Sequence, residues 1–131
     1  MSEARFWRYL NNNMKDHWFA IRVENMAISG TPDLWYVLFD KSGAGWIELK
    51  YLKKYQKKLS IKHFTKEQKH ILNRINLYST AYLFIKIEND YYLIEGSQSN
   101  KVIGMTIEEL KNVSYAVWYK SIDFTELRGL L

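Results

Sequence analysis

Two carboxylates and a lysine have a spacing in the sequence that is suited to chemistry on a phosphate. Asp33 follows Pro32, the one proline in the chain, and Glu48 and Lys50 stand fifteen and seventeen residues beyond Asp33. Carboxylate oxygens are preferred ligands of hard divalent cations, and an ammonium group beside them can stabilise negative charge on a phosphate. If neighbouring strands carry these three side chains, the set is suited to metal-assisted hydrolysis of a phosphodiester bond.

The hydrophobic pattern around these residues predicts two strands joined as a hairpin. Residues 33–40 and 46–52 are rich in aromatic and aliphatic residues, and a glycine-containing turn separates them. Side chains alternate along a strand, so Glu48 and Lys50 point to one face. Placing Asp33 opposite Glu48 centres the hairpin ahead of the glycine turn, so we expect a skewed or bulged hairpin.

A bound cation is expected to hold the acidic groups together. Clustered carboxylates repel one another unless a cation compensates their charge. Mg²⁺ is the expected metal, with Mn²⁺ as a substitute, and the backbone carbonyl of Leu49 is a natural further ligand. Lys50 would orient or activate the attacking water, or stabilise the charge that develops on the phosphate.

An amphipathic helix is predicted at the N-terminus, over residues 2 to about 15. Glu3, Phe6, Trp7 and Leu10 lie on one stripe of this helix. Glu3 therefore has two interpretations. It is an acid that favours the helix dipole, or it is a further acid of the site, since an unpaired carboxylate on an apolar stripe is costly.

A second helix is predicted from Thr65 to Ser79. Thr65 and Gln68 match a capping box, in which the two residues at the helix start exchange hydrogen bonds. Gln68 also aligns with Ile71 and Leu72 on the apolar stripe, which aims it inward. Both a capping role and a role in the site stay open for Gln68.

A lysine-rich segment, residues 50–62, separates the second strand from this helix. It carries six lysines and few helix or strand signals, so we expect a mobile basic loop. Such lysines are usually only solvated, but beside a phosphate-cleaving strand they are better interpreted as contacts to a nucleic-acid backbone. The candidate contacts are Lys53, Lys54, Lys57, Lys58 and Lys62.

The remaining elements predict the fold class. Further strands are expected at residues 17–23, 81–88, 91–95 and 115–119, and short helices at 106–112 and 123–128. Strands interleaved with helices in this order predict an α/β fold with a mixed central β-sheet flanked by helices. No linker or internal repeat interrupts the chain, so one domain over residues 1–131 is expected.

Composition narrows the function classes. The formal net charge of +5 suits a polyanionic partner, although many soluble proteins share such a balance. The absence of cysteine excludes disulfide frameworks, thiolate zinc sites and cysteine nucleophiles. Because no apolar run approaches the roughly 18 residues that a membrane span requires, we expect a soluble, cytoplasmic protein with no membrane partner.

The joint pattern resembles the PD-(D/E)xK nuclease superfamily through Pro32-Asp33 and Glu48-Leu49-Lys50. It is similar to the archaeal Holliday junction resolvase and VRR-NUC branches. These place an acid on the first helix, a Ser/Gly loop before the PD pair, and a Gln on the helix after the ExK strand. The corresponding residues here are Glu3, Ser29-Gly30 and Gln68.

This resemblance covers residues 1–95, and residues 96–131 would form a C-terminal extension. It implies a restriction-endonuclease-like core and a Mg²⁺-dependent DNA endonuclease. The enzyme would cut branched DNA, such as a flap or four-way junction, as a homodimer with a metal in each subunit. Two alternatives stay open, a non-catalytic nucleic-acid-binding module on the same fold and a nuclease acting on RNA or DNA ends.

The resemblance also implies residue roles. Catalysis would depend on the acids, the lysine and the glutamine of the motif, and Ser29 would join the lysines in contacting nucleic acid. The catalytic set is Glu3, Asp33, Glu48, Lys50 and Gln68, and the metal ligands are Glu3, Asp33, Glu48 and the Leu49 carbonyl.

Overall fold

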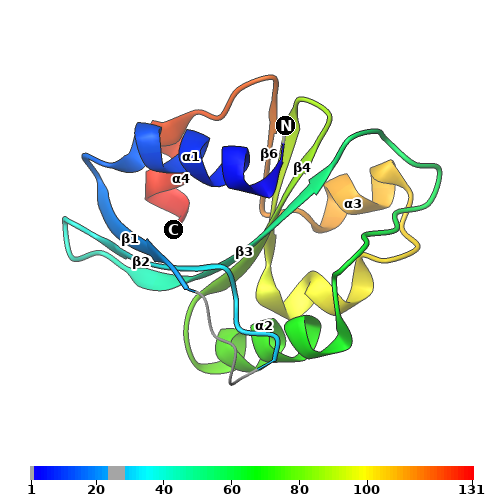
Figure 1. Cartoon of the computed structure of the whole chain (residues 1–131), viewed down its shortest axis with the longest axis horizontal. Helices are drawn as coiled ribbons and strands as arrows, with labels where there is room; N and C mark the ends of the chain where they lie inside the picture. Colours follow the sequence, from blue (N-terminus) through cyan, green and yellow to red (C-terminus); the bar gives the residue numbers. More distant parts are fainter. Residues whose placement is uncertain (1, 24–28) are drawn as a thin grey trace.

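A six-stranded mixed β-sheet with helices on both faces forms the core of the protein (Figure 1). The computed structural model describes residues 2–23 and 29–131. The strands, which lie in chain order across the sheet, are β1 (Trp18–Arg22), β2 (Leu34–Leu38), β3 (Ala44–Leu52), β4 (Ala81–Ile87), β5 (Asp90–Glu95) and β6 (Ala116–Tyr119). The helices are α1 (Glu3–Met14), α2 (Lys66–Tyr78), the 3₁₀ helix η1 (Gly96–Lys101), α3 (Ile107–Val113) and α4 (Phe124–Leu130).

Strands β3 and β4 pair in parallel, and the other four neighbouring pairs are antiparallel. A parallel pair needs a long crossover, which here contains α2. The predicted α/β fold with a mixed sheet flanked by helices is therefore confirmed. Within the described residues, no helix is long and apolar enough to cross a membrane.

An apolar layer covers each face of the sheet, because successive side chains of β4 point to opposite faces and are all buried. Phe84 faces a cluster that includes Phe6 of α1 and Leu127 of α4. Leu83 faces a second cluster that includes Leu72 of α2 and Leu110 of α3. Figure 1 shows α1 and α4 together on one side of the sheet, with α2 on the other.

Helix α1 forms as its sequence pattern predicts. The Ser2 side chain accepts a hydrogen bond from the Arg5 backbone N–H, which caps the first turn. Phe6, Leu10 and Met14 are buried against the sheet, and Glu3 lies half-buried at the start of the same stripe. The helix thus fixes an acid at the edge of the apolar layer.

The β2–β3 hairpin has the predicted register but a regular turn. The ladder runs from Val37↔Ala44 to Leu34↔Ile47, and its next step places Asp33 opposite Glu48. The expected bulge is wrong, because the Leu38 N–H donates to the Gly43 carbonyl at 2.8 Å and closes the turn in register. Lys41 provides the reversal by adopting a left-handed backbone, with φ of 64°.

The basic segment is irregular, as predicted, and it is anchored to the rest of the fold at Leu59. Lys50 belongs to β3, and the segment proper follows Leu52. Leu59 is buried, its N–H donates to the Met105 carbonyl at 2.7 Å, and its own carbonyl accepts from the Gly104 N–H at 2.7 Å. The sequence pattern missed this anchoring because the buried residues of the segment follow neither a helical nor a strand period.

Residues 96–131 complete both layers of the sandwich. β6 pairs with β5 and extends the sheet, while α3 and α4 cover its opposite faces. The Tyr82 hydroxyl donates to the Leu130 carbonyl at 2.9 Å, and the Tyr9 hydroxyl accepts from the Ile122 N–H at 3.2 Å. These contacts connect the C-terminal part to β4 and to α1, the helix that carries Glu3.

Candidate active site

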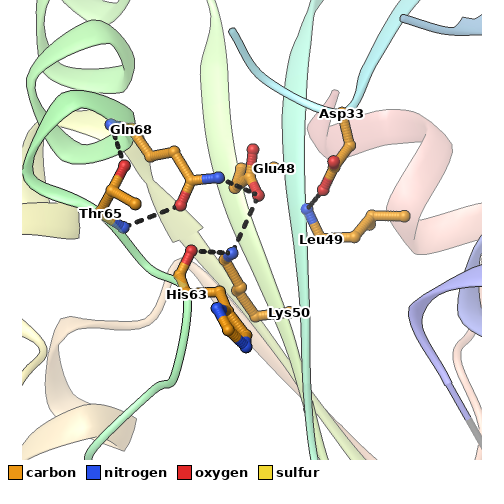
Figure 2. A network of polar contacts seen from close by, with 7 residues as sticks. All are labelled: Asp33, Glu48, Leu49, Lys50, His63, Thr65 and Gln68. Atoms are coloured by element: carbon orange, nitrogen blue, oxygen red, sulfur yellow. Dashed lines mark hydrogen bonds and ion pairs between the residues drawn. The ribbon is translucent and has the colours of Figure 1, made fainter. Parts of the chain in front are cut away.

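Four of the predicted catalytic residues, Asp33, Glu48, Lys50 and Gln68, meet where β3 passes the start of α2 (Figure 2). Glu48 and Lys50 lie on the α2 side of β3, while Asp33 immediately precedes β2 and Gln68 lies in the first turn of α2. Only 1% of Glu48 and 3% of Lys50 is exposed. Charged side chains are seldom buried to this degree without partners, so their contacts define the site.

One carboxylate oxygen of Glu48 is held from two sides. The Lys50 Nζ lies 3.3 Å from Glu48 Oε2, and the Gln68 amide Nε2 donates to the same oxygen at 3.4 Å. The other oxygen, Oε1, is equally buried but accepts no hydrogen bond from any residue that the structure describes. A buried carboxylate oxygen without a donor is suited to a cation.

Asp33 is fixed against the same strand by the backbone. Its Oδ2 accepts a hydrogen bond from the Leu49 N–H at 2.8 Å. The N–H and carbonyl of one strand residue point to the same side, so the Leu49 carbonyl also points towards the position of Asp33. Because the β2 ladder ends at Leu34↔Ile47, this side of Leu49 is left to the Asp33 side chain.

Burial dominates the electrostatics of Glu48. Burial, followed by the negative charge of Asp33, raises the pKa of Glu48 to about 9 against the opposing effect of Lys50. Burial also raises the pKa of Glu3, where Lys50 lowers the pKa and Asp33 raises it. A buried carboxyl group whose pKa is raised by a neighbouring acid favours a proton or a bound cation.

The carboxylates of Asp33 and Glu48 lie close enough for the charge of Asp33 to raise the pKa of Glu48. Across residues 2–23 and 29–131, no three histidine or acidic side chains gather closely enough to hold a metal ion by themselves. Mg²⁺ commonly binds through one or two carboxylates, with waters and substrate phosphates completing its shell. The donor set of Asp33, Glu48 and the Leu49 carbonyl therefore fits Mg²⁺, while Glu3 as a further ligand stays a prediction.

Gln68 makes the contacts of both predicted roles at once. The side-chain Oε1 of Gln68 accepts a hydrogen bond from the Thr65 N–H at 2.9 Å. The backbone N–H of Gln68 donates to Thr65 Oγ1 at 3.1 Å, which completes the capping box. The amide nitrogen is left to donate to Glu48. The cap therefore fixes the side chain that reaches the acid.

The predicted nucleic-acid contacts lie outside this cluster, on the surface. All five candidate lysines of the anchored segment are exposed: Lys53, Lys54, Lys57, Lys58 and Lys62. Ser29 lines a surface pocket of about 350 Å³ together with Lys66, Glu67, His70 and Ile71. Gly30, with φ of 90°, packs so closely on the Glu67 backbone that a Cβ would lie 2.6 Å from its carbonyl carbon.

One member of the polar network was not identified from the sequence. The Lys50 Nζ donates to the backbone carbonyl of His63 at 2.9 Å, and it lies 5.5 Å from the centre of the Phe64 ring. A carbonyl contact depends on backbone direction rather than on residue type. No pattern in the sequence therefore pointed to it.

Comparison with known proteins identifies the fold. No protein-family model and no curated protein sequence matches this chain. The structure of Archaeoglobus fulgidus Hjc, a Holliday junction resolvase from an archaeal hyperthermophile, is similar, with a TM-score of 0.62 and 19% sequence identity. The match covers 96% of this chain and 99% of that chain. At this level of identity the likeness shows a common fold, and the activity has to be argued from the site.

Proposed function

We propose that this chain is a Mg²⁺-dependent endonuclease that hydrolyses phosphodiester bonds of branched DNA. The observation that carries the proposal is the buried Oε1 of Glu48, which lies beside Asp33 and has no hydrogen-bond partner among the described residues, with the Lys50 ammonium paired to the same carboxylate. The fold shared with the Archaeoglobus resolvase supports the same class of activity.

The proposed metal site uses Asp33, Glu48 and the Leu49 carbonyl, with Glu3 as a further acid. When bound, Mg²⁺ would lower the pKa of a water molecule and neutralise charge on the phosphate. Binding requires Glu48 in its ionised form, so the raised pKa makes binding of the metal a competition with a proton.

Residues of this chain position the charged groups that would take part in the reaction. Lys50 presents a positive charge whose position is set by Glu48 and by the His63 carbonyl, and it would stabilise charge that develops on the phosphate. Gln68 holds Oε2 of Glu48 and leaves Oε1 for the metal. The buried surroundings strengthen these interactions because they exclude water.

DNA would be bound by the basic segment next to the site. Its exposed lysines follow directly from the strand that carries Glu48 and Lys50, and the anchoring of Leu59 restricts where they lie. Each lysine–phosphate contact adds about one unit to the salt dependence of binding. A branched substrate is proposed because the Archaeoglobus neighbour is a Holliday junction resolvase.

A homodimer is proposed through the apolar face of β1. Phe19 is 53% exposed and Ile21 is 46% exposed, and alternation places both on one face of the strand. Their cross-strand neighbours on β2 are Val37 and Trp35. Exposed apolar patches of this kind mark interaction sites, and two-fold dimers are the commonest assemblies of soluble proteins.

The dimer is tested by light scattering of the wild-type protein and a Phe19→Asp variant. The wild type is expected at twice the chain mass and the variant at the chain mass. Tyr119→Asp is the control, because Tyr119 is an exposed aromatic residue on β6, at the opposite edge of the sheet. A monomeric wild type would rule out this interface.

The activity is tested with Mg²⁺ on a panel of linear duplex, single-stranded, flap and four-way junction DNA. We expect cleavage of the branched substrates by the wild type and loss of cleavage by Asp33→Asn. Asparagine keeps an acceptor for the Leu49 N–H, so the fold is expected to survive. Asp16→Ala, at an exposed acid beyond the end of α1, is the control. Equal rates for Asp33→Asn and wild type would refute the assignment.

A further inference from the structure

His63 has a strained backbone beside the candidate active site. Its φ is 63°, in the left-handed region that residues other than glycine seldom adopt. Figure 2 shows its carbonyl pointing at the Lys50 ammonium, with the hydrogen bond at 2.9 Å. Strained residues persist only where the surrounding structure imposes the conformation, and they concentrate at functional sites.

The neighbours of His63 impose this conformation from both sides. Ile61 and Phe64 are both buried in the apolar cluster on the α2 side of the sheet, and the Phe64 N–H donates to the Ile61 carbonyl at 3.4 Å. Thr65 follows at once as the N-cap of α2. The exposed His63 therefore connects fixed positions, and its carbonyl direction is set by the fold rather than by its side chain.

A carbonyl partner suits a lysine that has to act on a phosphate. Lysine has a long flexible side chain, so a defined ammonium position requires specific acceptors. A carboxylate acceptor offsets the charge of the ammonium, whereas a neutral carbonyl orients it and leaves the charge in place. Lys50 has one partner of each kind, Glu48 and His63, and the Phe64 ring lies close to its ammonium.

We propose that His63 is a positioning residue, and that its left-handed backbone holds the Lys50 ammonium where the phosphate binds. The imidazole has no part in this role. The inference rests on the proposed nuclease function for its purpose, but the lysine–carbonyl contact is testable without any nuclease activity.

The test is a series of substitutions at His63 that separates backbone from side chain. All of them remove the imidazole, but glycine and asparagine accept a left-handed backbone, alanine accepts it less well, and the β-branched valine resists it. His63→Gly and His63→Asn are expected to cleave junction DNA at least about tenfold faster than His63→Val, with His63→Ala between them. If valine prevents folding, the alanine variant carries the comparison.

The second readout is chemical labelling of lysine amines, followed by mass spectrometry. Lys50, only 3% exposed, is expected to label slowly in the wild type and in the glycine and asparagine variants. In His63→Val its labelling should accelerate several-fold, because the ammonium loses its carbonyl acceptor. Exposed Lys62 provides an internal reference for the labelling rate.

A matched control separates this effect from general strain. Lys120, with φ of 70°, is another non-glycine residue with a left-handed backbone, and it lies in the connection between β6 and α4. Lys120→Val introduces the same conflict far along the chain from the site. It should lower the melting temperature without changing cleavage or the labelling of Lys50.

The outcomes distinguish this inference from the proposed function. If the wild type cleaves no DNA but Lys50 labelling follows the glycine-to-valine order, the nuclease proposal fails and the positioning role stands. If all replacements reduce cleavage equally, the imidazole acts and the inference is wrong. It is also wrong if His63→Val leaves Lys50 labelling and cleavage at wild-type levels.

Discussion

Two helices of this protein begin with the same motif and differ in what it does. α2 begins with Thr65 and Gln68, and α3 begins with Thr106 and Glu109. In both, the threonine side chain accepts from the N–H of the third helical residue, and the side chain of that residue accepts from the threonine N–H. Local geometry is therefore nearly the same in the two caps.

The two caps differ in the side-chain atoms of the third helical residue that the cap itself does not use. Gln68 uses its amide oxygen for the cap and retains an N–H₂ group, which donates to Glu48 at 3.4 Å. Glu109 is exposed, and its hydrogen bonds from Thr106 hold its pKa below the ordinary value. An amide can accept and donate at once, whereas a carboxylate at position 68 would face Glu48 with like charge. The α2 cap can therefore support the candidate site, because β3 presents Glu48 to the amide group of Gln68.

Replacing the buried acid gives the largest expected effect. Glu48→Gln keeps the shape of the side chain but removes the charge that Mg²⁺ requires, so cleavage should fall by about 10³-fold or more. Glu109→Gln makes the same chemical change at the exposed cap and should leave cleavage unchanged. Single-turnover cleavage, with Mn²⁺ titration by calorimetry, checks both variants. Unchanged metal binding by Glu48→Gln would contradict the proposed ligand set.

Introducing a carboxylate into the α2 cap gives the next largest effect. Gln68→Glu retains an acceptor for the Thr65 N–H but places a negative charge beside Glu48 and raises the pKa of Glu48 further. Cleavage at pH 7 should therefore fall by about tenfold and recover as the pH rises, because more of Glu48 ionises. Rates measured from pH 6 to pH 9 test this. A Gln68→Glu rate equal to the wild-type rate across that range would remove Gln68 from the site.

The sequence was sufficient for features that depend on local pattern. The Thr65–Gln68 capping box follows from residue type at fixed spacing, and strand alternation placed Glu48 and Lys50 on one face. The pairing of Asp33 with Glu48, which was placed on the spacing of the motif ahead of the glycine turn, agrees with the register of the ladder. These are short-range rules, and they located the core of the candidate site.

Features that depend on the path of irregular backbone were not predictable. The hairpin is regular because Lys41 adopts a left-handed conformation, and no signal distinguishes that lysine from others. Lys50 and His63 are 13 residues apart, and the segment between them is directed by the burial of Leu59 and Phe64. Such anchoring depends on surfaces that form only when the chain has folded.

The contributions of Glu48 and Glu109 to stability should depend on pH with opposite signs. In the metal-free protein the pKa of Glu48 is about 9, against an ordinary value of 4.5, so the folded state retains a proton that the unfolded chain releases. The contribution of Glu48 is full below pH 4.5 and declines as the pH rises towards 9, by up to about 1.4 kcal/mol per pH unit. Glu109 has a lowered pKa, so its contribution is lost as the pH falls.

Chemical denaturation from pH 4 to pH 9 measures these slopes. Glu48→Gln should flatten the decline of the free energy of unfolding at high pH. Glu109→Gln should weaken only the loss of this free energy at low pH. A wild-type curve that rises between pH 6 and pH 9 would mean that Glu48 is already ionised without metal. In that case the raised pKa, and the competition between proton and metal, would be wrong.

The smallest expected effect comes from removing each capping threonine. Thr65→Ala and Thr106→Ala each delete an acceptor at a helix start, which typically lowers the free energy of unfolding by about 1 kcal/mol. The two losses should be similar because the caps have similar geometry. Only Thr65→Ala should also slow cleavage, by a few-fold, because fraying of the first turn of α2 moves Gln68 away from Glu48. Thermal unfolding and junction cleavage of both variants, measured side by side, separate the two consequences. Equal cleavage by the two variants would mean that the α2 cap stabilises the helix and contributes nothing to the position of the acid.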